Sequence, residues 1–272
     1  MTAPADTEQA SLRLVTIPIS HYCEKARWAL DRAGLRYREE RHIQGIHRVA
    51  ARRAGAGATV PVLVTPHGSI GESQEILAWV DEHLAPEQRL FPSEPIARAE
   101  VNALCRRLDE NLGPTGRRLM YVNVLPQRKL VLAYNNQGVP AWEDRALRIG
   151  WPLLKRFVAD QLGIVAGIES RDEAAVFHEL DHVATLLSDG RPYLVGDRFS
   201  AADLTFAALS APITVPSGYG VALPQPEELP PAFARVVEQV REHPAGRYAL
   251  ELFAEHRRPV PEQTQTSTVP SR

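Results

Sequence analysis

A proline-rich break at residues 85–95 divides the sequence into two parts with different hydrophobic patterns. The stretch reads APEQRLFPSEP, with three prolines between two helical patterns. Proline interrupts a helix and disfavours helical backbone in the residue before it, so no element is expected to run through this stretch. Strand and helix patterns alternate before the break, and helical patterns dominate after it. The sequence therefore predicts two domains of different class, joined by a linker at residues 85–95.

The first part predicts a small α/β domain at residues 12–84. Short β-rich runs predict strands, and apolar residues at helical spacing predict helices. In chain order we expect a strand at 12–17, a helix ending at Gly34, a strand at 37–43, a helix at 48–53, a strand at 60–64 that a turn at 66–69 connects to a further strand, and a helix at 73–84. This β-α-β-α-β-β-α order in about 75 residues fits one compact α/β layer.

The second part predicts an all-helical domain at residues 96–258. Val101, Leu104, Cys105 and Leu108 recur at intervals of three and four, as on one face of a helix. Residues 1–11 and 259–272 are polar and aperiodic, and we expect both to be flexible tails.

Composition excludes several classes of protein. The chain has 31 Lys+Arg against 33 Asp+Glu, so no net positive charge favours nucleic acid. Two cysteines cannot build a disulfide scaffold or a four-thiolate zinc site. No apolar run approaches the ~20 residues that span a bilayer, and the N-terminus lacks signal-peptide regions. We expect a cytoplasmic protein with small-molecule partners, and neither nucleic acid nor membrane as a partner.

The junction between the first strand and the first helix carries the candidate chemistry. Ser20 stands where a hydroxyl residue caps a helix, and Cys23 follows one turn later. A helix N-terminus offers unpaired N–H groups and the positive end of the dipole, which stabilise a thiolate. Ser20 could donate a hydrogen bond to a substrate sulfur, and Cys23 could itself react. The structural alternative is a plain cap at Ser20 and a packed apolar side chain at Cys23.

Two further features are compatible with a bound ligand. Val60-Pro61 begins a strand, where proline donates nothing to the ladder and a cis bond would turn the Val60 backbone toward a ligand. Gly71-Glu72-Ser73 opens the next helix and offers N–H groups and a hydroxyl to an anionic group. Their order along the chain is more specific than either feature alone.

Taken in order, these residues resemble the glutathione transferase family. The residues similar to its N-terminal glutathione site are Ser20, Cys23, Lys25, Arg27, Val60, Pro61, Glu72 and Ser73. The stretch YLVGDRFSAAD at 193–203 is similar to one in the family's helical domain. The resemblance covers nearly all of residues 12–258. It implies a thioredoxin-like α/β domain followed by an all-α helical-bundle domain, usually as a homodimer, that conjugates glutathione to an apolar electrophile in detoxification.

The resemblance also implies a role for each matching residue. Ser20 or Cys23 would be catalytic, with Ser20 stabilising the glutathione thiolate. The Val60 backbone would pair with the cysteinyl part of glutathione. The implied glutathione-binding residues are Tyr22, His47, Arg48, Thr59, Val60, Pro61, Glu72 and Ser73. Of these, the Glu72-Ser73 pair would hold the γ-glutamyl end, and the His47-Arg48 pair would face the glycyl carboxylate.

Three departures from the family pattern leave alternatives open. His21 stands where proline is usual, Thr59 replaces a frequent lysine, and Gly55 replaces a common asparagine. A glutathione-dependent thiol–disulfide oxidoreductase using Cys23 is a second enzymatic hypothesis. A non-catalytic ligand carrier or regulatory protein on the same fold is a third.

One motif points to a different chemistry. His178-Glu179-Leu180-Asp181-His182 matches the H-E-x-x-H of zinc hydrolases. Asp181 is charged where that motif is usually apolar, and the flanking leucines fit an ordinary amphipathic helix. We therefore expect solvated histidines and no metal, with glutathione as the co-substrate.

The helical domain carries three more expectations. Compared with a compact family member, its extra length lies near residues 113–170, which we interpret as an irregular insertion that sets substrate selectivity. Ser200 and Asp203 predict a capping box that starts a helix at Ala201–Leu209. Two arginine pairs are expected to be solvated or at an interdomain rim, namely Arg106-Arg107 and Arg117-Arg118. Four aromatic residues are expected to line an apolar pocket or to lie in the core, namely Tyr121, Tyr134, Trp142 and Trp151.

Overall fold

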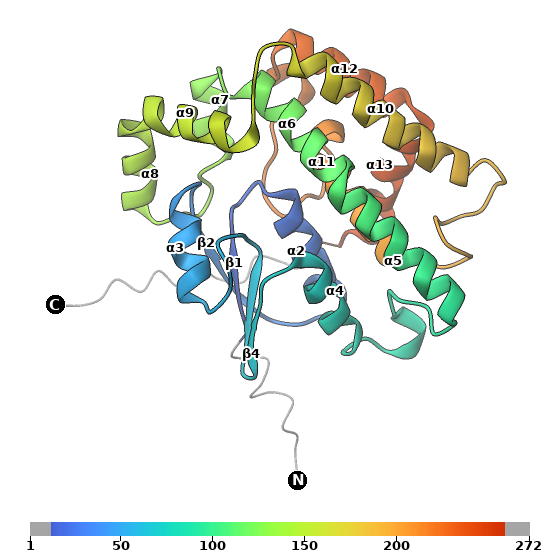
Figure 1. Cartoon of the computed structure of the whole chain (residues 1–272). Coiled ribbons are helices and arrows are strands. Elements are labelled where there is room, and N and C mark those ends of the chain that lie inside the picture. The colour runs from blue at the N-terminus through green and yellow to red at the C-terminus, as the bar shows by residue number, and fades with distance from the viewer. Residues whose placement is uncertain (1–11, 259–272) are drawn as a thin grey trace.

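The computed structural model describes residues 12–258. The two expected tails therefore lie outside the described residues. A small sheet occupies one side of the molecule and a group of helices the other, with helix α2 (His21–Arg32) between them (Figure 1). This arrangement confirms the predicted fold class, a thioredoxin-like domain followed by a helical domain.

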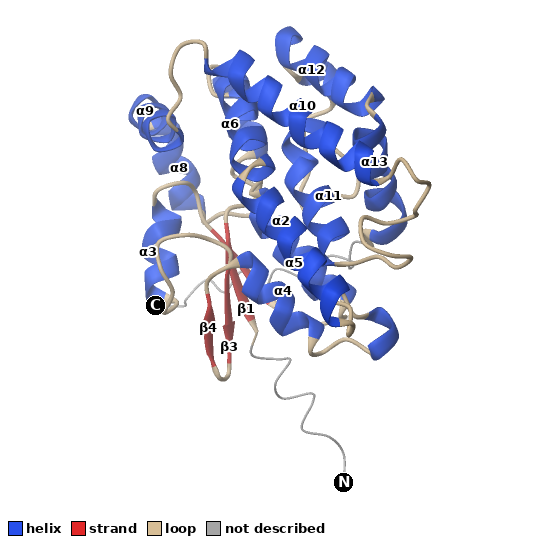
Figure 2. Cartoon of the chain, turned by 45° about the vertical axis from the view of Figure 1, so that its right-hand side comes forward, coloured by secondary structure: helices blue, strands red, loops and turns tan. Residues whose placement is uncertain are grey.

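The sheet has four short strands in the order β2-β1-β3-β4 (Figure 2). The bounds are β1 (Arg13–Thr16), β2 (Arg38–Arg41), β3 (Val62–Thr65) and β4 (Gly68–Ile70). Strand β1 runs parallel to β2, with α2 as the crossover, whereas β3 is antiparallel to both β1 and β4. The antiparallel register pairs Val15 with Val62, so the end of β1 lies beside the start of β3.

Alternate residues of β1 face opposite sides of the sheet, as the pleat of a strand requires. Leu14 is buried in the main core with residues of α2 and of α4 (Ser73–Asp81). Its neighbour Val15 is buried in a second, smaller cluster with Ala50 and Ala51 of α3 (Ile46–Arg53). Apolar residues on both faces therefore produce three layers, with α2 and α4 on one face and α3 on the other.

The helical domain is built around α11 (Ala201–Thr214), which is buried almost all round. Ser200 and Asp203 form the predicted capping box, and Asp203 also accepts hydrogen bonds from the Leu194 N–H and the Tyr248 hydroxyl. The helices around it are α5 (Pro95–Glu110), α6 (Leu112–Val124), α7 (Arg128–Tyr134), α8 (Ala141–Ile149), α9 (Trp151–Leu162), α10 (Ile168–Leu186), α12 (Pro231–Glu242) and α13 (Pro244–His256). Two single 3₁₀ turns, Pro86–Gln88 and Pro226–Glu228, lie between helices.

The region expected to be irregular is mostly helical. Residues 113–170 contain nearly all of α6, followed by α7, α8 and α9, and the beginning of α10. Glycine and proline interrupt the periodicity here, but packing against the rest of the protein outweighs their low helix propensity. Helix α11 also extends past the predicted end at Leu209, through Pro212, to Thr214.

Helices α7–α9 lie on the same side of the molecule as α3 (Figures 1 and 2). The Glu143 carboxylate of α8 accepts hydrogen bonds from the Ile43 N–H (3.0 Å) and from His42 Nδ1 (2.6 Å). Gln44 exchanges side-chain hydrogen bonds with Asn135 at 2.6 and 2.8 Å. The segment 113–170 is thus joined to the α/β domain by buried polar contacts.

Among the described residues, no helix has both the length and the apolar character to cross a membrane.

Candidate functional site

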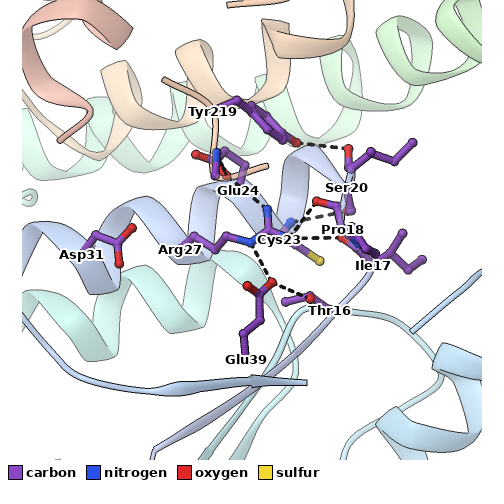
Figure 3. A network of polar contacts seen from close by, with 12 residues as sticks. Thr16, Ile17, Pro18, Ser20, Cys23, Glu24, Arg27, Asp31, Glu39 and Tyr219 are labelled. Atoms are coloured by element: carbon purple, nitrogen blue, oxygen red, sulfur yellow. Dashed lines mark hydrogen bonds and ion pairs between the residues drawn. The ribbon is translucent and has the colours of Figure 1, made fainter. Parts of the chain in front are cut away.

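Ser20 is the N-cap of α2 and lies in the short segment between Thr16, the last residue of β1, and the helix. Its backbone is extended, its N–H bonds the Ile17 carbonyl at 3.1 Å, and its Oγ accepts from the Cys23 N–H at 3.4 Å (Figure 3). The side chain is half-buried. Because the oxygen accepts this capping bond, the hydroxyl hydrogen is available to donate. The first N–H groups of α2 add the positive end of the helix dipole.

Arg27 holds the segment before Ser20 in place. Its Nη2 donates to the carbonyls of Pro18 (2.8 Å) and Ile17 (3.3 Å), as Figure 3 shows. Its other nitrogens bind two carboxylates, Glu39 at 2.8 Å and Glu24 at 3.1 Å. The side chain is 2% exposed, so these charges interact with little solvent between them. The buried guanidinium of Arg27, further along α2, therefore fixes the segment between β1 and α2.

A second set of contacts comes from the helical domain. The Tyr219 hydroxyl donates to the Ile19 carbonyl at 3.1 Å, and the Gly220 N–H donates to Glu24 at 3.1 Å. Arg257 Nε binds the other oxygen of Glu24 at 2.7 Å. Both ends of the segment 17–20 are thus held, one by α2 and the other by the segment after α11.

Cys23 does not have the environment of a reactive thiol. Its side chain is fully buried, and burial raises the pKa of the thiol to about 11, with Arg27 and the Ser20 hydroxyl lowering it only in part. Desolvation therefore raises the pKa of this thiol by more than the nearby helix N-terminus lowers it. Cys23 therefore fits the structural alternative, in which it is a packed apolar side chain and not a reactive thiol.

The two residues between Ser20 and Cys23 face the helical domain. Tyr22 donates its hydroxyl to the Asp109 carbonyl at 2.8 Å, and burial raises the pKa of Tyr22 to about 12. His21 is 2% exposed, and its Nε2 has no hydrogen-bond partner. Burial, and then the charge of Arg117, hold the pKa of His21 well below its usual value, so this imidazole is neutral. Tyr22 is therefore engaged between the domains, and the contact with glutathione that the resemblance implies for it stays a prediction.

The Val60-Pro61 and Glu72-Ser73 pairs lie at the starts of neighbouring elements. The Val60–Pro61 bond is cis, and it leads into β3 beside the end of β1. Pro61 is buried, Val60 is half-buried and Thr59 is exposed. Glu72 is the exposed N-cap of α4, and Ser73 is the buried first residue of that helix. The sheet register therefore brings Val60 to the strand end that precedes Ser20.

His47 and Arg48 lie on the first turn of α3 and differ in charge. His47 Nδ1 accepts from the Gly45 N–H at 3.1 Å, and burial lowers the pKa of His47 to about 4. His47 is therefore neutral at pH 7, and Arg48 carries the positive charge of the pair. Arg48 donates to Gln161 of α9 at 3.2 Å.

An apolar cavity of about 60 Å³ lies beside this segment. Ile19, the residue before Ser20, is part of its wall, and the wall is almost wholly apolar. Other wall residues come from α6, α7 and the segment after α11, among them Tyr121, Tyr134, Tyr219 and Leu223. Two of the four aromatic residues singled out in the sequence thus line it. Trp142 is 61% exposed, and Trp151 is buried outside the wall.

Comparisons with known proteins agree with this geometry. Residues 14–88 match the model of the glutathione S-transferase N-terminal domain. Solved structures that share the fold include a glutathione S-transferase from Xanthobacter autotrophicus, with 17% identity, 92% of this chain and 97% of that chain covered, and a TM-score of 0.59. The chain has the glutathione transferase fold.

Two further glutathione S-transferases match over similar lengths. The one from Pseudomonas fluorescens has 19% identity, covers 92% of this chain and 98% of its own, and has a TM-score of 0.55. The one from Methylobacterium radiotolerans, a complex with glutathione sulfonate, has 21% identity, covers 93% and 97%, and has a TM-score of 0.50. Identities at this level establish the shared glutathione transferase fold. No curated protein sequence matches the chain.

Within this glutathione transferase fold, the H-E-x-x-H motif has a structural use. Arg107 binds both oxygens of Glu179, at 2.8 and 3.1 Å, on the buried side of α10. The described residues contain no group of three or more His, Cys, Asp or Glu side chains placed to hold a metal ion. Glu179 is therefore an ion-pair partner, and α10 is the amphipathic helix of the alternative interpretation.

Several residues that shape the candidate site have no role predicted from the sequence. Arg27 is part of the family-like motif, and its place two turns into an apolar helix is a sequence signal of a buried charge. Tyr219 lies in a proline-rich connection, and no local sequence pattern predicts its hydrogen bond to Ile19. Arg117 was expected to be solvated or at a rim, and its Nε is buried without a partner.

Proposed function

We propose that this protein is a glutathione transferase that conjugates glutathione to a small apolar electrophile. The observation that carries the proposal is the Ser20 hydroxyl at the N-terminus of α2, with an apolar cavity wall beginning at the preceding residue. The hydroxyl and the helix dipole together stabilise a negative charge on sulfur. The cavity supplies a dry place for the electrophile next to that charge.

The proposed mechanism depends on placing a thiolate and an electrophile together. The Ser20 O–H and the first N–H groups of α2 favour the thiolate form of bound glutathione, whose proton is released to solvent. The sulfur electron pair then attacks an electrophilic carbon in the cavity and a C–S bond forms. In a substitution the leaving group departs with its bonding pair; in an addition the π bond of an activated double bond breaks and the resulting carbanion takes a proton from solvent. Holding the two reactants in contact supplies part of the rate enhancement.

The remaining glutathione contacts follow from the positions of the family-matching residues. We propose that the Val60 backbone pairs with the cysteinyl part, beside the end of β1. Glu72 and Ser73 would hold the γ-glutamyl end at the start of α4. Arg48, as the charged member of its pair, would face the glycyl carboxylate. Thr59 would contribute only at the exposed rim.

The test is conjugation kinetics with Ser20→Ala, using glutathione and an activated aryl halide. We expect kcat/KM to fall by about a hundredfold, the loss typical of removing one donor to a developing or full negative charge. Ser20→Thr, which keeps the hydroxyl, should retain much of the rate. An unchanged rate in a folded Ser20→Ala variant would refute the role given to the hydroxyl.

The burial of Cys23 favours conjugation over thiol–disulfide exchange as the activity. A carrier on the same fold is distinguished by experiment: retention on immobilised glutathione without turnover supports the carrier, and turnover supports the enzyme. We further propose a cytoplasmic homodimer with a role in detoxification. Light scattering of the purified protein measures the oligomeric state, and a monomer mass would contradict the dimer.

A further inference from the structure

Arg117 of α6 lies across the interdomain contact from the Ser20 segment. Its guanidinium carbon is 5.9 Å from the centroid of the Tyr22 ring, two residues after Ser20. Its Nε is buried and has no hydrogen-bond partner. Among the described residues no carboxylate forms an ion pair with it; Glu179 and Asp172 pair instead with Arg107 and Arg118. Arg117 is therefore a cation at the domain interface without a counter-ion.

Three other arginines that contact buried carboxylates are paired, whereas Arg32 of α2 resembles Arg117 in having a buried Nε without a partner and a position over an aromatic ring, that of Phe199. Arg118, the next residue on α6, forms two hydrogen bonds of 2.7 and 2.6 Å with Asp172. Arg107 and Arg257 each bind a buried carboxylate in the same way. An unpaired guanidinium loses hydration without regaining hydrogen bonds, which costs free energy. A ring face offsets only part of that cost, so an anionic acceptor would complete the environment of Arg117.

The position of Arg117 along α6 relates it to both halves of the proposed site. Gly113, one turn earlier, lies against the Tyr22 hydroxyl and brings α6 close to α2. Tyr121, one turn later, lines the apolar cavity. Arg117 therefore lies between the Tyr22 contact and the cavity on one helix face. Residues at intervals of four share a helix face, so this order follows from the helix itself.

A second unpartnered polar atom lies close by. His21 is 2% exposed with no partner for Nε2, and its ring centroid is 4.4 Å from that of Tyr22. Lys25, the other nearby cation, is neutralised by Asp109 at 2.8 Å. Arg117 is thus the cation of this group that a ligand would meet without first breaking an ion pair.

We propose that Arg117 binds a carboxylate of a substrate held between the two domains. This deepens the proposed function, on which it rests, by assigning a negatively charged substrate group to the face of α6 opposite Ser20. The carboxylate has two possible sources: the thiol tripeptide, or an apolar electrophile that carries one. The same guanidinium chemistry recognises either, through two parallel N–H···O bonds.

The experiment measures binding by calorimetry without turnover. The ligands are S-methylglutathione, an aromatic enone bearing a carboxylate, and the methyl ester of that enone. The variants are Arg117→Gln, Arg117→Lys and, as a control for net charge, Arg106→Gln, which changes an exposed arginine of α5. Thermal unfolding of each variant establishes that it is folded.

We expect Arg117→Gln to weaken one carboxylate ligand by about tenfold or more, with Arg117→Lys intermediate. Weaker S-methylglutathione binding assigns the carboxylate to the tripeptide, and weaker binding of the acid but not the ester assigns it to the electrophile. The proposal is overturned if Arg117→Gln binds both carboxylate ligands with wild-type affinity. It is also overturned if Arg117→Gln weakens binding of the acid and of its ester by the same factor, or if Arg106→Gln weakens binding as much as Arg117→Gln does.

Failure of the proposed function gives a different result. A wild-type protein that binds these ligands but shows no conjugation refutes the transferase activity, while the Arg117 result still stands on binding. A wild-type protein that binds none of the carboxylate ligands overturns the Arg117 proposal itself.

Discussion

Ser20 performs two tasks with one hydroxyl group. Its oxygen accepts the Cys23 N–H and so caps α2, while its hydrogen is left to donate. The same atom therefore starts the helix and, in the proposed function, contacts the sulfur. A substitution at Ser20 removes both, and Ser20→Ala is expected to lower stability by about 1 kcal/mol besides its effect on rate.

Cys23 is predicted to be unreactive in the folded protein. Burial raises the pKa of its thiol from 9.0 to about 11, which lowers the thiolate fraction at pH 8 by about a hundredfold. We expect modification by a thiol reagent to be at least that much slower than in the unfolded chain. Cys23→Ala should also leave glutathione conjugation within about twofold of wild type.

The matched measurement is labelling of the same protein in guanidinium chloride, where both cysteines react. Cys105 is also buried, and burial raises the pKa of its thiol too, so the Cys23→Ala variant isolates each contribution. Rapid labelling of Cys23 at pH 8 under native conditions would contradict this prediction and revive thiol–disulfide exchange.

For single residues, the sequence predicts where a side chain lies along the secondary structure better than it predicts how deeply that side chain is buried. The place of Ser20 after a strand and before an apolar helix follows from local pattern alone. The pKa values of Cys23 and His47 depend on burial by residues far away in the chain, which no local pattern contains. The roles of the glutathione-binding residues stay predictions until they are tested.

Within α6, two glycines differ in how much space surrounds them. A Cβ added at Gly113 would overlap the Tyr22 hydroxyl and lie 2.8 Å from its ring carbon Cζ. At Gly116 the nearest atom, on Ile213, would be 3.7 Å away, an ordinary contact. The two glycines lie on the same helix but differ in the space beside them.

We therefore predict opposite effects for two identical substitutions. Gly113→Ala should lower the free energy of unfolding by about 1–3 kcal/mol, because it forces α6 away from Tyr22. Gly116→Ala should raise it by up to about 1 kcal/mol, because alanine favours helix. Urea denaturation measures both, and equal shifts in the two variants would contradict the close approach.

Elements whose apolar residues recur at a regular helix or strand interval were predicted correctly, and elements whose pattern is interrupted by glycine and proline were not. The strand and helix order of residues 12–84 follows from short apolar runs, and the capping box of Ser200 and Asp203 starts α11 as expected. Residues 113–170 were expected to be irregular because Gly113, Gly116 and several prolines obscure the pattern. Their helices form against α3 and the rest of the domain, a contact between distant segments that the local sequence does not show.

For the whole molecule, His42 links the stability of the interdomain contact to pH. Although burial lowers its pKa, hydrogen bonds to Glu143 and Glu40 raise the pKa of His42 from 6.5 to about 9. A raised pKa means that the contribution is complete below pH 6.5 and is lost as the pH rises through 9. With allowance for solvent screening, we expect a loss of roughly 1–2 kcal/mol over that range.

The measurement is unfolding by urea from pH 6 to 10 for wild type and His42→Gln. The wild-type advantage over the variant should shrink between pH 6.5 and 9 and vanish above it. Glu143→Gln removes one of the two carboxylate partners of His42 and should flatten the profile in part, because Glu40 remains. Parallel profiles for wild type and His42→Gln would show that the contact does not titrate.

Arg257 ties the end of α13 to α2. It binds Glu24 and Asp31, each at 2.7 Å, and is 5% exposed. Arg257→Met leaves two buried carboxylates short of a partner and should cost about 3–5 kcal/mol. Arg258→Met, at the exposed next position, should cost less than about 0.5 kcal/mol. Similar unfolding midpoints for both variants would contradict the importance of the pair.

This pairing also has a consequence for the order of events during synthesis. Glu24 leaves the ribosome close to its first partner, Arg27, but 233 residues before its second partner, Arg257. Until then the nascent thioredoxin-like domain carries Glu24 and Asp31 on the face of α2 that later becomes buried. The segment bearing Ser20 can therefore reach its final, fully paired state only once α13 has been made and docked, so the α/β domain is translated before the helical domain but completed together with it.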